Sequence, residues 1–126
     1  LVIGLAGGIT CFYATLYIKR VLKIDDSLDV FPVHGVGGIL GTFLAGVFAS
    51  TELGVFSGFG FAEGVTSMLG QIKIQLIGIV AIVVFTAVAS YILLRVVDAL
   101  VGLRIEKEGE YEGLDLSLHE EKGYDL

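Results

Sequence analysis

Three long stretches of the chain contain no Asp, Glu, Lys or Arg, and short polar segments separate them. A helix of about 20 apolar residues crosses the roughly 30 Å hydrocarbon core of a membrane. The pattern therefore predicts an all-α integral membrane region over residues 1–102, with three transmembrane helices at about 1–20, 30–51 and 74–100.

The composition agrees with a membrane location. Hydrophobic residues make up 55% of the chain, charged residues make up 17%, and the mean hydropathy is +0.86. These values are too apolar for an ordinary water-soluble domain. The first apolar stretch has no polar flank before Leu1, so we interpret the chain as a fragment that begins inside a helix.

The charges predict an orientation and a tail. Basic residues follow the first and third stretches, which places the first connecting loop and the carboxyl end in the cytoplasm of a cell with this protein in its plasma or inner membrane. Most of the formal net charge of −6 comes from residues 103–126. We expect this segment to be an acidic cytoplasmic tail that is disordered without a partner.

A single histidine interrupts the second apolar stretch, in the sequence DVFPVHGVGGILG. Gly37, Gly38 and Gly41 follow His34 at three, four and seven residues, and these spacings share one helix face. A face made of one ring and several glycines suits close approach by another helix or a narrow passage. Ionisable groups inside membranes are commonly functional, so we expect His34 to be buried, neutral and directed into a helix bundle. A histidine that only packs against a neighbouring helix is the open alternative.

The residues before His34 are typical of a helix start. Asp29 is expected to cap the helix that begins near Val30. Pro32 fits in the first turn, where its missing amide donor has no intrahelical partner.

Few other groups on the chain favour catalysis or metal binding. Cys11 is the only cysteine, and no second His, Cys or acidic residue lies at ligand spacing from His34 on the same stretch. No nucleophile, carboxylate pair or phosphate-binding loop lies near His34 either. We expect no enzyme activity, no cofactor, no metal and no nucleic-acid partner.

Three ordered motifs resemble those of the Amt/Mep/Rh family of ammonium transporters. The sequence DDSLDVFPVHGVGGILGTFLAGVFAS resembles the signature of the family's penultimate helix, and residues 60–66 and 101–124 resemble two further motifs. The acidic tail favours the Amt branch. Glu120 departs from the family's usual glycine after the tail histidine, His119.

The resemblance implies a fold and a mechanism. The family has eleven helices, built from two inverted repeats and a last helix, and assembles as a homotrimer; this chain resembles helices nine to eleven. His34 matches one of two pore histidines, and Val30 matches a position that lines the cytoplasmic half of the pore. Ammonium is expected to lose its proton before an apolar pore, to cross as ammonia, and to leave the proton to the histidine pair.

The resemblance also implies partners and leaves alternatives. Besides ammonium, ammonia and membrane lipid, the expected partners are two further copies of the chain and a regulatory protein of the PII type at the cytoplasmic tail. An ammonium sensor and a structural membrane subunit are the competing functions. A second histidine upstream of Leu1 would favour transport over both.

Overall fold

A computed structural model describes residues 1–122, which form helices and loops without any strand. The chain divides into two compact units, one from Leu1 to Val83 and one that begins at Val84. Within the described residues, Val2–Leu22 and Met68–Val101 are long and apolar enough to cross a membrane. The second apolar helix, Phe31–Val47, is shorter.

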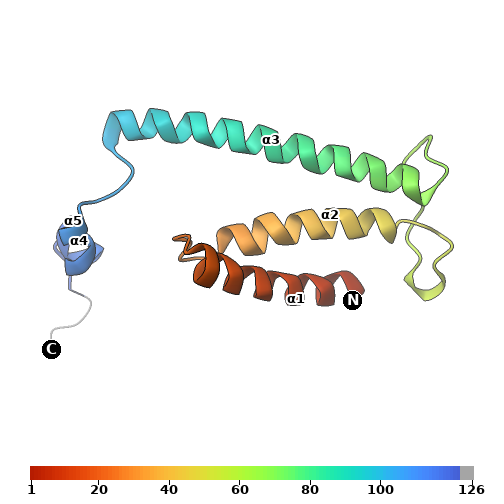
Figure 1. Ribbon diagram of the computed structural model, residues 1–126, viewed down its shortest axis with the longest axis horizontal. Coiled ribbons are helices and arrows are strands. Elements are labelled where there is room, and N and C mark those ends of the chain that lie inside the picture. The colour runs from red at the N-terminus through yellow and green to blue at the C-terminus, as the bar shows by residue number, and fades with distance from the viewer. Residues whose placement is uncertain (123–126) are drawn as a thin grey trace. The chain divides into compact units, whose positions relative to one another are not determined.

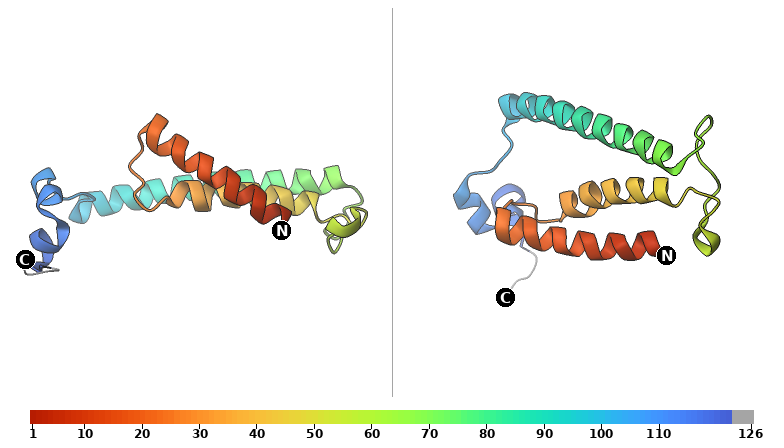
Figure 2. Two further views of the ribbon diagram at one scale, coloured as in Figure 1. Left: turned by 90° about the horizontal axis from the view of Figure 1, so that it is seen from below. Right: turned by 45° about the vertical axis from the view of Figure 1, so that its right-hand side comes forward.

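A pair of antiparallel helices begins the first unit (Figures 1 and 2). Helix α1 (Val2–Tyr17) continues into a π-helical turn, η1 (Ile18–Leu22), and ends at Lys23, whose φ of 53° is left-handed. The chain returns through a second π-helical segment, η2 (Phe31–Val36), and continues as α2 (Gly37–Val47). Because the connection is short, η2 and α2 pack back along α1.

A hydrogen-bonded loop ends α2 at Val47, before the predicted end at residue 51. The carbonyls of Ala49 and Ser50 accept hydrogen bonds from the N–H groups of Gly60 (2.8 Å) and Gly58 (2.9 Å). A Cβ atom on Gly58 would lie 2.8 Å from Ala49 Cα, so the backbone near Gly58 approaches the backbone near Ala49 as closely as only glycine allows. The loop also holds a short 3₁₀ helix, η3 (Gly54–Phe56). These backbone bonds are made instead of further helical bonds.

Helix α3 (Met68–Val101) begins in the first unit, ahead of the predicted start at residue 74. Gln71 is buried there, and its Oε1 accepts a hydrogen bond of 2.9 Å from the N–H of Ala62 in the preceding loop. A Cβ atom on Gly46 would lie 2.7 Å from Gln75 Cγ, which shows that α2 and the start of α3 approach closely. Gln71 thus links the loop to the first turn of α3.

The second unit contains the rest of α3 and most of the predicted tail. Helix α3 ends at Val101 and is followed by Gly102, whose φ of 77° favours glycine. Two short helices come next, α4 (Lys107–Glu112) and α5 (Leu114–His119). The Arg104 guanidinium pairs with Glu110, with Nη2 2.9 Å from Oε1. The tail, expected to be disordered without a partner, contains these two short helices as far as His119, and residues 123–126 lie outside the described part.

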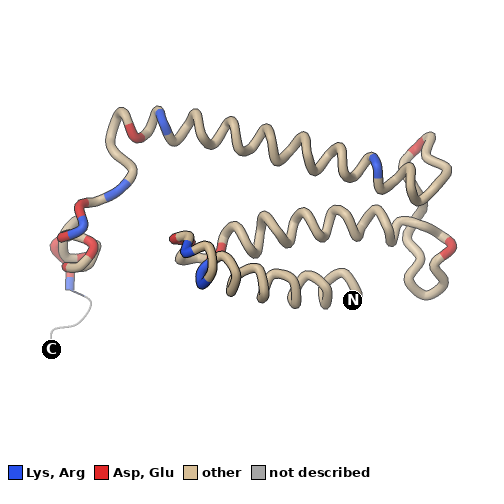
Figure 3. The backbone as a smooth tube through the Cα atoms, in the orientation of Figure 1, with Lys and Arg blue, Asp and Glu red and all other residues tan. Residues whose placement is uncertain are grey.

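Charged residues lie near the helix ends, in the loops and in the tail (Figure 3). The helices between these positions carry apolar side chains. This distribution is the one that a bilayer selects, since charge is costly in hydrocarbon and favourable at its boundary.

Candidate functional site around His34

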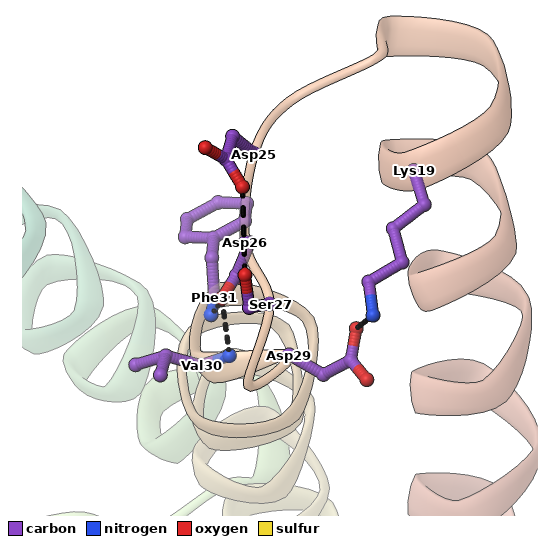
Figure 4. A network of polar contacts seen from close by, with 7 residues as sticks. All are labelled: Lys19, Asp25, Asp26, Ser27, Asp29, Val30 and Phe31. Atoms are coloured by element: carbon purple, nitrogen blue, oxygen red, sulfur yellow. Dashed lines mark hydrogen bonds and ion pairs between the residues drawn. The ribbon is translucent and has the colours of Figure 1, made fainter. Parts of the chain in front are cut away.

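The turn before His34 is held by the carboxylate of Asp26 (Figure 4). Its Oδ1 accepts a hydrogen bond from the N–H of Val30 (2.9 Å), and its Oδ2 accepts one from Phe31 (2.8 Å). Both donors belong to the start of the helix, where backbone N–H groups have no intrahelical acceptor. Asp26 is therefore the side chain that caps this helix.

The prediction that the Asp29 side chain caps the helix was wrong. Its backbone carbonyl does accept the N–H of Val33 at 3.1 Å, as expected at a helix start. Its carboxylate instead pairs with Lys19, with 2.8 Å between Nζ and Oδ1 (Figure 4). Asp29 has a left-handed φ of 56°, which turns its side chain away from the amides that a cap would reach. The ion pair links the end of the first helix to the start of the second.

His34 lies in η2, the π-helical segment Phe31–Val36. Wide turns of this kind are rare and occur frequently at functional sites. The ring was expected to be buried, but the side chain is exposed, because no other described segment covers it. Val30, which precedes η2, is also exposed, at 53%. Pro32 in the first turn of η2 is fully buried, and its position agrees with the prediction.

The three glycines after His34 differ in their surroundings. A Cβ atom on Gly37 would lie 2.9 Å from the sulfur of Cys11 on α1. A Cβ atom on Gly38 or Gly41 would meet nothing within 4 Å. Gly37 therefore allows a close approach between helices of this chain, whereas Gly38 and Gly41 face open space.

Two contributors to this site have little or no signal in the sequence. Asp26 is one of three acidic residues in DDSLD, and spacing alone does not tell which of them caps the helix. Cys11 is apolar in character and lies in an apolar run, so nothing in the sequence points to its contact with Gly37. Among residues 1–122, no three His, Cys, Asp or Glu side chains come together to hold a metal ion.

Two long apolar helices and an ionisable ring in a third, shorter apolar helix are features found in membrane transport proteins. A sequence model of the Ammonium Transporter Family matches residues 1–124. The chain therefore belongs to the ammonium transporter family.

Curated relatives share this assignment. The chain is similar to a putative ammonium transporter of Methanothermobacter thermautotrophicus, with 44% identity over 100% of the chain and 30% of that protein. It is 41% identical to the ammonium transporter Amt1 of Archaeoglobus fulgidus, over 98% of the chain and 30% of the relative. It is 34% identical to an ammonium transporter of Bacillus subtilis, again over 98% of the chain and 30% of the relative. The chain thus spans about 30% of the length of these relatives.

Proposed function

We propose that this chain forms the last three transmembrane helices and the cytoplasmic tail of an ammonium transporter of the Amt branch. Family membership and the names of the relatives support ammonium as the substrate. The single observation that carries the proposal further is His34, an ionisable ring on a wide helical turn that no described segment covers.

The proposed chemistry follows from the properties of imidazole. A neutral ring donates a hydrogen bond through one nitrogen and accepts one through the other, so two rings in contact bind ammonia and pass a proton between them. The exposed side of His34 is where a second histidine, from a segment other than those described, completes the pair. Ammonium gives up its proton before this region and crosses as ammonia, since a bare cation is costly in an apolar passage.

The residues beside His34 have supporting roles in this proposal. Val30 contributes an apolar wall on the cytoplasmic side, and the open glycines Gly38 and Gly41 leave room for the helices that complete the pore. The pore is one of three in a homotrimer, in the plasma or inner membrane. The tail lies in the cytoplasm, where a regulatory protein of the PII type binds it.

Replacement of His34 in the complete transporter tests this function. Reconstituted His34→Ala protein should lose most of the ammonium-induced current, since the relay needs a titratable ring, and His34→Glu should retain part of it. Proton-transfer groups contribute on the order of a hundredfold or more to a rate, so the loss should be easily measured. His119→Ala, which removes the chain's other histidine from the tail, is the matched control and should keep the current.

The same experiment separates transport from a structural role. A His34→Ala protein that assembles normally and carries the wild-type current would show that His34 only packs. Size-exclusion chromatography of each variant establishes that a lost current reflects the pore and not a lost assembly.

A further inference from the structure

The sulfur of Cys11 lies beside the segment that carries His34. The Cys11 thiol is 3.9 Å from the carbonyl oxygen of Val33, the residue directly before His34, and donates toward it. The same sulfur would lie 2.9 Å from a Cβ atom built on Gly37. One side chain of α1 therefore touches η2 just before the histidine and α2 just after it.

From this juxtaposition we propose that Cys11 and Gly37 form a positioning contact that sets the direction of the His34 ring. The proposal rests on the proposed function, because it assigns a role in ammonium conduction through His34.

The physical argument concerns the backbone. The direction of a helical side chain is set by the rotation and height of its helix, and the packing of η2 and α2 against α1 restrains both. His34 is exposed on its free side, so within the described chain the neighbouring helix that packs against its segment is α1. The Cys11 sulfur fills the space that a larger residue at position 37 needs, which fixes the distance between the two helices.

A methyl group at position 37 tests this contact, because 2.9 Å is closer than a carbon and a sulfur can pack. Gly37→Ala should push α2 and η2 away from α1 and displace the ring. Misplacement of a reacting group by about 1 Å costs up to a hundredfold in rate. We expect the maximal ammonium-induced current per assembled transporter to fall at least tenfold, with the half-saturating ammonium concentration changed less than twofold.

Cys11→Ala combined with Gly37→Ala removes the sulfur that the new methyl group meets, and it should restore most of the current. The matched control is Gly38→Ala with and without Cys11→Ala. Gly38 faces open space and not Cys11, so any effect of Gly38→Ala should be unchanged by Cys11→Ala.

The outcomes separate this inference from the function on which it rests. A normal current in Gly37→Ala, a loss that Cys11→Ala fails to reverse, or an equal reversal at Gly38 would overturn the positioning role. A merely structural contact would lower the amount of assembled transporter while leaving the current per transporter at the wild-type value, which also contradicts the proposal. A wild-type current in His34→Ala would instead remove the proposed function itself.

Discussion

The two units of the chain differ in what their apolar helices touch. In the first unit, α1 packs against η2 and α2, and every residue that is buried within the described chain belongs to this unit. In the second, all the large apolar side chains from Val84 to Val101 are exposed, with Phe85 at 70% and Leu100 at 77%. Both regions are strongly apolar, so hydrophobicity does not explain the difference.

The two units also differ in glycine content. The helices of the first unit contain glycines throughout, and Gly37 and Gly46 each meet a side chain of another helix at less than 3 Å from a would-be Cβ atom. The segment 84–101 has no glycine. In a membrane, apolar surface alone does not drive helices together, whereas small residues allow the close contacts that do. The comparison predicts that the helices of the first unit pack against other helices and that the second half of α3 contacts lipid.

A charge on α3 tests the lipid-facing half of this comparison and should have the largest effect. Phe85 lies near the middle of the charge-free stretch and is exposed. Phe85→Lys should make membrane insertion of the α3 segment less favourable by about 3 kcal/mol, the cost of a lysine at the centre of a helix in hydrocarbon. The apparent free energy of insertion is measured in microsomes with engineered glycosylation sites.

Phe85→Leu is the control for this experiment, because it keeps an apolar side chain and should insert like the wild type. If lysine and leucine at position 85 inserted equally well, the exposed side of α3 would face water or a polar partner, and the contrast between the two units would fail.

The sequence predicted the helices better than it predicted their ends and contacts. Each of the three apolar runs without charge coincides with a helix, but only Val2–Leu22 and Met68–Val101 are long enough to cross a membrane, whereas Phe31–Val47 is shorter than the predicted span. The end of α2 depends on hydrogen bonds from Gly58 and Gly60, which come from beyond the helix and leave no periodic pattern. The two short tail helices were not predicted, and they are joined by a contact without a sequence signal, the hydrogen bond of 3.4 Å that Ser117 Oγ on α5 donates to the Gly109 carbonyl on α4.

At the candidate site, too, the sequence predicts one part and not the other. The chemistry of His34 is visible in the sequence, because an ionisable residue in an apolar run stands out. The residues that hold the His34 segment in place are not visible in this way. The acidic residues Asp26 and Asp29 are equally good caps by type, and the left-handed backbone at Asp29 decides between them. Gly37 differs from Gly38 only through the approach of Cys11, which depends on how α1 crosses the second helix.

The polar contacts of the first unit give the next largest effect. Asp26→Ala removes both side-chain acceptors from the start of the His34 helix and should lower the free energy of unfolding by about 1 to 2 kcal/mol. Asp29→Asn removes the charge from the pair with Lys19 and keeps a residue that tolerates a left-handed backbone. Because the side chains of this pair are 40% and 31% exposed, the loss should stay below about 1 kcal/mol.

Unfolding midpoints of the complete protein in detergent measure both variants. A larger loss in Asp29→Asn than in Asp26→Ala would mean that the ion pair, and not the cap, holds the turn before His34.

The smallest effect concerns the tail, where two short helices contact each other. Glu120 follows α5 with a left-handed φ of 55°, a conformation that favours glycine, and it places a negative charge at the carboxyl end of a helix. Glu120→Gly removes both the backbone strain and the unfavourable charge. The greater flexibility of glycine in the unfolded chain offsets part of this stabilisation, so α5 should become more stable by at most about 1 kcal/mol. Amide hydrogen exchange should then slow by up to about fivefold across residues 114–119.

Glu108→Gly removes the same side chain inside α4, where glycine disfavours helix, so exchange in α4 should accelerate. If both variants changed protection in the same direction, net charge rather than backbone conformation would control the order of the tail.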